Sequence, residues 1–184
     1  MTMSTGHACA RVLSRIRIPF MTAVVSGAAL VSMNALAGEE IMRGTIDGEE
    51  HVWERLEGQG DSPAFFTDVS SNVELFNLHG FKDGGAFDPR GSMVFSTSRM
   101  GDRLVNLELG YYENSSTGPD FLASDHVGEI DYTIDTIEVE GDTARISGEI
   151  SGELHYVEDA LHEEYDASRT RSVTVEFDTT LPRQ

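Results

Sequence analysis

The chain has 184 residues, one cysteine at position 9 and a formal net charge of −19. All 32 acidic residues follow position 37, where ten basic residues oppose them, so residues 38–184 carry a formal charge of −22. Such a surface repels phosphate backbones and anionic lipids, which argues against nucleic-acid binding. The chain has an excess of acids and a single lysine, Lys82. This composition is also typical of a protein that functions at high salt, where repulsion between its carboxylates is screened.

The first 37 residues predict a cleaved secretory signal peptide. Three arginines lie within the first 17 residues, and the apolar run Ile18–Val31 follows them. Ala35 and Ala37 then place small side chains where signal peptidase requires them, which predicts cleavage after Ala37 and export to the periplasm or beyond. The alternative is an uncleaved membrane anchor, but the run barely approaches the ~20 apolar residues of a spanning helix. Residues 38–184 are therefore expected to form one acidic domain that does not span a membrane.

Cys9 lies before the apolar run, so the processed chain contains no thiol. Disulfides, thiolate metal sites and cysteine nucleophiles are thereby excluded from it. An exported domain without disulfides depends on its hydrophobic core. A chain of this size buries roughly 70% of its unfolded surface, which suffices for one core.

Short runs of alternating apolar and polar residues, separated by Gly, Pro, Asp and Ser, predict β-strands through the first half of the domain. The Asp47-Gly48 pair marks a hairpin turn, and Trp53, the only tryptophan, is expected in the core. The predicted strands are Ile41–Ile46, His51–Leu56, Ala64–Val69, Val73–Phe81, Met93–Ser98 and Arg103–Tyr112.

The clearest pattern in the chain is a long hairpin over Glu129–Tyr156, with its turn at Gly141-Asp142. Val157–Arg171 interrupts the alternation. Val157, Leu161 and Tyr165 have i, i+4 spacing, so this segment is expected to form either one or two helical turns or a disordered acidic loop. A last strand over Ser172–Leu181 closes the domain.

These elements predict an all-β fold, a single antiparallel β-sandwich or barrel of about eight to ten strands. An outer-membrane barrel would also show the alternation. The polar end Pro182-Arg183-Gln184 and the many acids that its lumen would hold argue against that alternative.

Three segments resemble uncharacterised secreted bacterial all-β domains of sandwich-like type. These are the opening Gly44–Glu49, then Ile146–Leu154, and finally Val173–Asp178. The resemblance covers about a third of the processed chain and consists of strand and turn patterns. It implies a sandwich-like fold and no activity, and it carries no functional residue over to this chain.

Two groups of side chains are candidates for metal binding. The first group is His155, Glu158, His162 and Asp166. If Val157–Ala167 were helical, Glu158, His162 and Asp166 would share one face, and imidazole with carboxylates suits zinc. Asp83 and Asp88 flank Gly84-Gly85 in a manner that permits calcium binding. Neither spacing is a recognised metal signature. A solvated acidic face and an ordinary turn are the favoured explanations, so no metal site is assigned.

No catalytic residue and no cofactor site is assigned either. The sequence lacks a Gly-x-Ser-x-Gly elbow, a Ser-x-x-Lys motif and a phosphate-binding glycine loop. We therefore expect a non-catalytic exported domain that acts in binding or in the cell envelope, with an unknown protein or a small apolar ligand as partner. The alternatives are a lipocalin-like barrel for a small apolar ligand and a metal-dependent hydrolase.

Overall fold

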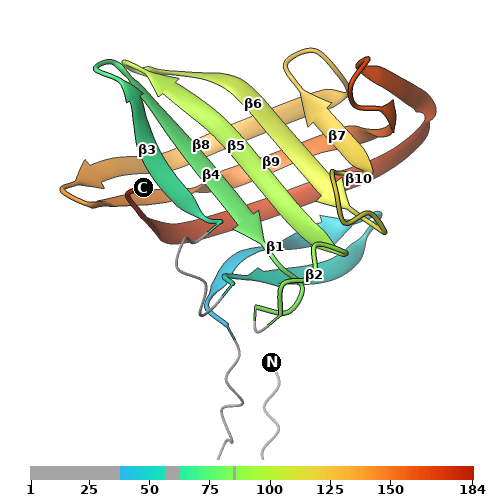
Figure 1. The fold of residues 1–184 in the computed structure, drawn as a ribbon, viewed down its shortest axis with the longest axis horizontal. Helices are drawn as coiled ribbons and strands as arrows, with labels where there is room; N and C mark the ends of the chain where they lie inside the picture. The colour runs from blue at the N-terminus through green and yellow to red at the C-terminus, as the bar shows by residue number, and fades with distance from the viewer. Residues whose placement is uncertain (1–37, 57–62, 85) are drawn as a thin grey trace, which may run out of the picture. The chain divides into compact units, whose positions relative to one another are not determined.

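A computed structural model describes residues 38–56, 63–84 and 86–184. The predicted signal peptide, residues 1–37, lies outside the described residues. The described part is built from strands alone, joined by turns and short loops (Figure 1). The strands are β1 Glu40–Ile46, β2 Glu49–Glu54, β3 Phe65–Ser70, β4 Val73–Gly80, β5 Ser92–Met100, β6 Arg103–Tyr112, β7 Phe121–Ser124, β8 Glu129–Glu140, β9 Thr143–Asp159 and β10 Glu164–Pro182.

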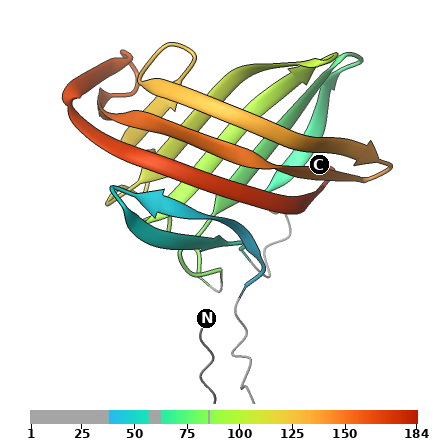
Figure 2. The same cartoon turned by 180° about the vertical axis from the view of Figure 1, so that it is seen from behind.

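All ten strands belong to one antiparallel sheet, in the order β2-β1-β10-β9-β7-β6-β5-β4-β3, with β8 paired to β9 beside this path. The predicted all-β antiparallel fold is therefore confirmed. Of the two architectures left open, the barrel is wrong, because the sheet is not closed. The sheet instead bends back on itself, so that β3–β7 lie opposite β8–β10, as seen from the front and from behind (Figures 1 and 2).

The core lies between these opposed parts of the sheet and follows from the alternation in the sequence. Phe95 of β5 stacks on Phe177 of β10 across it, with ring centroids 5.4 Å apart. Trp53 is fully buried, as predicted, and its indole N–H donates to the carbonyl of Gly91 at 2.9 Å. Burial of such large side chains supplies most of the driving force for folding.

Inward-facing glycines allow the sheet to bend so sharply. A Cβ on Gly44 of β1 would overlap the carbonyl of Thr174 on β10, and a Cβ on Gly148 of β9 would overlap that of Thr133 on β8. Only a residue without a side chain permits the backbones to approach so closely. Gly44 and Gly148 are therefore positions where the neighbouring strand bends over the inner face.

The first and last described residues are tied to the sheet. The backbone N–H of Gly38 donates to the carboxylate of Glu54 at 3.1 Å, and the N–H of Gly84 donates to the same oxygen at 3.0 Å. At the other end, the N–H of Gln184 donates to the carbonyl of Phe66 on β3 at 3.0 Å. These bonds tie the chain before β1 and the loop after β4 to β2, and the chain end after β10 to β3.

The segment Val157–Arg171 corrects one prediction, because it forms neither a helix nor a disordered loop. β9 runs on to Asp159 and β10 begins at Glu164, so the segment is the end of a long hairpin. Val157 and Tyr165 face each other across that hairpin, while Leu161 lies at its tip with 92% of its surface exposed. The i, i+4 spacing therefore reflects a cross-strand pair and a turn.

The short strand β7 is absent from the sequence-based prediction. Phe121, Leu122 and Ala123 are buried one after another, so the strand shows no period-two alternation. It pairs with β6 over Glu108–Tyr111 and with β9 at two positions only. This narrow connection joins the two opposed parts of the sheet.

Candidate functional site

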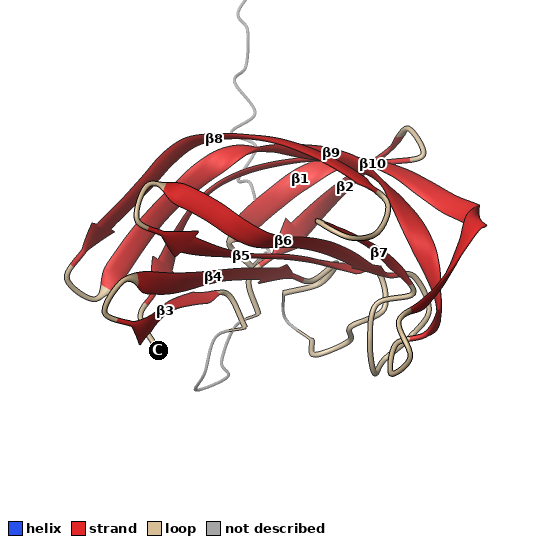
Figure 3. Cartoon of the chain, turned by 90° about the horizontal axis from the view of Figure 1, so that it is seen from above, coloured by secondary structure: helices blue, strands red, loops and turns tan. Residues whose placement is uncertain are grey.

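The sheet is open between β6 and β8. β7 pairs with β6 from Glu108 onward, and among the described residues no strand pairs with β6 on this side over Arg103–Leu107. β8 pairs only with β9, so its opposite side is likewise without a strand partner in the described part of the chain. We call the gap between these two strand edges the seam. Figure 3 shows β6 and β8 at the same margin of the opposed layers.

Local sequence determines where the seam begins and ends. The tight turn between β5 and β6 contains Gly101, whose φ of 62° suits a glycine. A β-bulge follows at Asn106, which adopts a φ of 54° and interrupts the pairing of β6 with β5. Asparagine tolerates this left-handed conformation better than most side chains do. The bulge lies where β6 passes from its unpaired half to the half that β7 covers.

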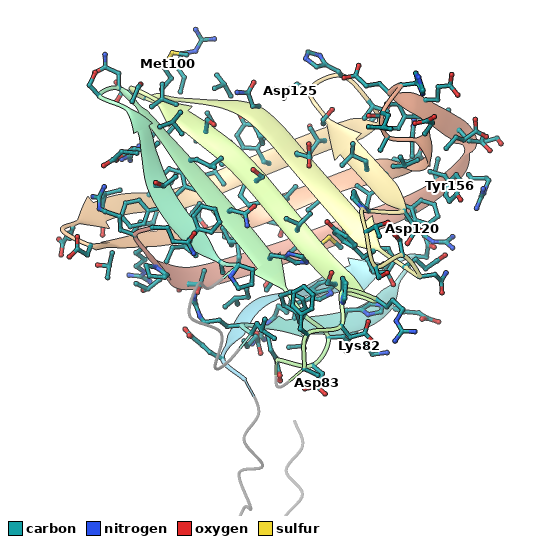
Figure 4. The ribbon with its side chains drawn as sticks, viewed as in Figure 1. Lys82, Asp83, Met100, Asp120, Asp125 and Tyr156 are labelled. Atoms are coloured by element: carbon teal, nitrogen blue, oxygen red, sulfur yellow. The ribbon has the colours of Figure 1, made fainter. Side chains whose placement is uncertain are left out.

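The seam contains a cleft of about 600 Å³ near the β5–β6 turn. Its apolar lining comes from both edges, and Tyr132 of β8 is 46% exposed there. Met100, at the β5–β6 turn, and Asp125, in the β7–β8 loop, are both labelled along the upper margin in Figure 4. The lining residues are Arg99, Gly101, Asp102, Arg103, Leu104, Tyr132, Ile134, Asp135, Thr136 and Ile137.

The Arg99 side chain, from β5, joins β4 to β8 beside the seam. Its guanidinium donates to the Glu74 carboxylate at 2.6 Å and to the carbonyl of Ile137 on β8 at 3.2 Å. The same group lies 5.7 Å from the ring centroid of Phe76. Because Arg99 and Glu74 are both about three-quarters buried, their ion pair is less screened than one on the open surface. Arg99 and the exposed Arg103 are two of the few cations in this acidic domain.

A second cleft, of about 390 Å³, lies toward the β7–β8 loop and brings together several polar groups. Its lining includes Glu108, His126, Glu163 and Tyr165. Burial raises the pKa of the Tyr165 phenol, and the nearby Glu163 and Glu108 carboxylates raise it further. These are hydrogen-bonding groups that suit recognition of another molecule.

The four residues considered for zinc are not brought together. Within the described ranges, no group of three or more His, Asp or Glu side chains is arranged to hold a metal ion. His162 pairs with Asp159 at 2.7 Å at the hairpin tip, and this hydrogen bond lowers the pKa of the Asp159 carboxyl. Asp166 instead accepts hydrogen bonds from Ser168. Because the segment is a hairpin, the helical face that would have aligned these groups does not exist.

The calcium candidates Asp83 and Asp88 occupy an ordinary loop. The Asp88 carboxylate accepts two hydrogen bonds from the Arg90 guanidinium, at 2.9 and 2.6 Å, which lower the pKa of the carboxyl. The carbonyl of Asp83 accepts a turn hydrogen bond from the N–H of Ala86. Figure 4 shows Asp83 at the lower margin, on the outside of its loop. Turn and loop hydrogen bonds therefore account for the positions of Asp83 and Asp88.

A histidine–serine pair that the sequence did not indicate lies on β4 and β5. The Nε2 atom of His79 is 2.9 Å from the Oγ atom of Ser92, and the imidazole stacks between Phe81 and Tyr112. Ser92 is fully buried, so no substrate reaches its hydroxyl. Burial lowers the pKa of His79 to about 4, so the ring is neutral at pH 7. The pair is structural, with its polar atoms satisfied inside an aromatic cluster.

His79 should make stability depend on pH between about 6.5 and 4. Above this range both states hold a neutral ring. On acidification the unfolded chain takes up the proton first, so stability falls until the folded state also protonates. The full shift corresponds to about 3 kcal/mol, most of which is lost between pH 7 and 4.5. We expect urea titrations at pH 7 and 4.5 to show this loss for the unmodified chain.

The variant His79→Gln isolates the effect, because an amide retains a donor for Ser92 but does not titrate here. The acidic residues respond to pH in both proteins, so the difference between the two proteins reports His79. An equal pH dependence of both would contradict a neutral, buried imidazole.

The described residues include no helix long and apolar enough to span a membrane. Comparisons of this chain with protein-family models, with curated proteins and with solved structures find no match.

Proposed function

We propose that residues 38–184 form an exported, non-catalytic domain that acts by binding another molecule through the seam. This proposal rests on the cleft of about 600 Å³ between β6 and β8. The strand edges on both sides of this cleft have no strand partner in the described structure. Partly exposed apolar side chains and two arginines line the cleft, a mixture that suits recognition of another molecule. The signal-peptide pattern and the resemblance to secreted sandwich-like domains support export.

The lipocalin-like alternative has less support. Its ligand would occupy a cavity between the opposed parts of the sheet. That space holds fully buried aromatic rings instead, among them Trp53, Phe66, Phe76 and Phe95. The metal-dependent hydrolase has no supporting group of ligands among residues 38–56, 63–84 and 86–184. Surface binding at the seam is the role that the geometry favours.

The absence of thiols from the processed chain allows a direct test. The variant Tyr132→Cys places one thiol in the seam, and Val69→Cys, at a 62% exposed site on β3, serves as the matched control. We expect a periplasmic extract of the host to slow alkylation of the Tyr132→Cys variant several-fold and to leave the Val69→Cys rate unchanged. Equal rates with and without extract for both variants would refute the proposal.

Export is tested separately by sequencing the N-terminus of the protein recovered from its host. A chain that begins at Gly38 is the expected result. A chain recovered intact from the cytoplasm would contradict export, and the binding test above would then use a cytoplasmic extract.

A further inference from the structure

We propose that the free edge of β8 accepts an extended segment of a partner protein as an added β-strand. The added strand would direct apolar side chains inward and basic side chains outward. This inference rests on the proposed binding function of the seam and specifies the class of its occupant.

The edge of β8 that faces away from β9 presents backbone N–H and C=O groups. The carbonyls of Glu129 and Thr133 face β9, because a Cβ on Gly152 or Gly148 would overlap them. Residues of an antiparallel strand alternate between its two edges. Ile130, Tyr132 and Ile134 therefore direct their N–H and C=O groups away from β9, toward the seam.

Arg99 gives independent evidence that this edge can bind a donor. Its guanidinium donates to the carbonyl of Ile137, a group on the same side of β8 beyond the bulge near Asp135. A side chain from β5 thus already occupies one acceptor of the edge. Ile130–Ile134 presents further backbone carbonyls on this edge, and a partner that binds there would not displace Arg99.

The inner face of this stretch is apolar. Ile130 and Ile134 are partly buried against the core, and Tyr132 leaves 46% of its surface exposed. Leu104, from the opposite edge of the seam, lines the same cleft as Tyr132 and Ile134. An added strand would place every second side chain in this cleft, where apolar residues would remove further apolar surface from water.

The outer face of the same stretch is acidic. Glu129 and Asp131 project from β8 on this side, and β9 adds Glu149 and Glu153 beside them. The outward residues of an added strand would lie next to these carboxylates. Lysine or arginine at those positions would complement the charge, whereas acidic residues would be repelled.

The acidic edge also discriminates against a second copy of this chain. Pairing of two β8 edges would bring the outer-face carboxylates of both copies together. Natural edge strands use such like charges to prevent pairing with themselves. A partner with alternating basic residues is therefore the occupant that the charges favour.

The probe for this proposal is a capped peptide of about seven residues in which valine alternates with lysine. Its binding to the processed chain is measured by fluorescence anisotropy at low ionic strength. In antiparallel addition, the residues with inward side chains direct their N–H groups toward β8. We expect N-methylation of the valines to weaken binding about tenfold or more, and N-methylation of the lysines to change it little.

Equal affinity of the two methylated peptides would overturn strand addition. A peptide with glutamate in place of lysine is expected not to bind, and equal binding of that peptide would overturn the electrostatic part of the proposal. Self-association of the chain that excludes the probe would identify a second copy as the occupant and would also overturn it.

Two variants at one position provide the matched test in the protein. Tyr132→Pro removes an N–H that points away from β9, so the β8–β9 pairing is preserved. Tyr132→Ala removes the side chain but keeps the N–H. We expect the proline variant to lose the peptide and the alanine variant to retain most of the affinity. If the proline variant does not fold, the methylated peptides on the unmodified chain decide alone.

This outcome is distinguishable from failure of the proposed function. Protection of the Tyr132→Cys thiol by the extract, with equal binding of both methylated peptides, would preserve the binding function and refute strand addition. No protection by the extract would refute the binding function itself, whatever the synthetic peptide does.

Discussion

Replacing Phe95 by alanine is expected to lower the free energy of unfolding by about 3 to 5 kcal/mol. Phe95 is fully buried on β5, and its ring stacks on Phe177 of β10 at a centroid distance of 5.4 Å. The substitution removes a large apolar surface and leaves a cavity where the two parts of the sheet meet. Urea unfolding followed by circular dichroism would measure the loss.

Val69→Ala is the control for this substitution. Val69 is 62% exposed on the edge strand β3, so its truncation should change stability by less than about 0.5 kcal/mol. A similarly small effect of Phe95→Ala would show that the opposed parts of the sheet do not pack through this ring.

Gly44→Ala is expected to cost about 3 kcal/mol, although it adds a single methyl group. That methyl group would overlap the carbonyl of Thr174, a backbone atom that cannot rotate out of the way. The φ angle of Gly44 lies outside the left-handed region, so the cost comes from the collision alone. β1 and β10 would have to separate at Gly44, which thermal unfolding would report as a lower midpoint.

Gly118→Ala provides the matched control. A Cβ at Gly118 would meet nothing within 4 Å, and its φ angle likewise lies outside the left-handed region. This substitution should be neutral or stabilise the chain by a few tenths of a kcal/mol, because it restricts the unfolded state. Equal effects of the two substitutions would mean that β1 and β10 tolerate a wider spacing at Gly44.

The sequence predicts most of the strands because their signal is local. The alternation in β6 and in the β8–β9 hairpin follows directly from one buried and one exposed face. β7 was missed because three successive buried residues, Phe121–Ala123, show no such period. The start of β10 was also missed. Val157, Leu161 and Tyr165 are spaced four residues apart, which suggested a helix, but the chain forms a hairpin there.

The seam could not be predicted, because it depends on pairings between distant segments. Its existence follows from the short length of β7 and from the register that places β7 and β8 one after the other along β9. No single residue in the sequence indicates the short length of β7 or this register. Asn106 and Gly101 are ordinary turn and bulge residues in the sequence, and only the pairing shows that they delimit an unpaired edge.

The N–H of Gly38, the residue that follows the predicted cleavage position, donates to the Glu54 carboxylate at 3.1 Å. In the precursor, Gly38 contributes a neutral peptide N–H. If signal peptidase cuts after Ala37, the same nitrogen becomes a protonated α-amino group beside a carboxylate, and the bond becomes charge-assisted. The mature domain would then gain an ion pair that its precursor lacks, so proteolysis itself would strengthen the anchor of β1.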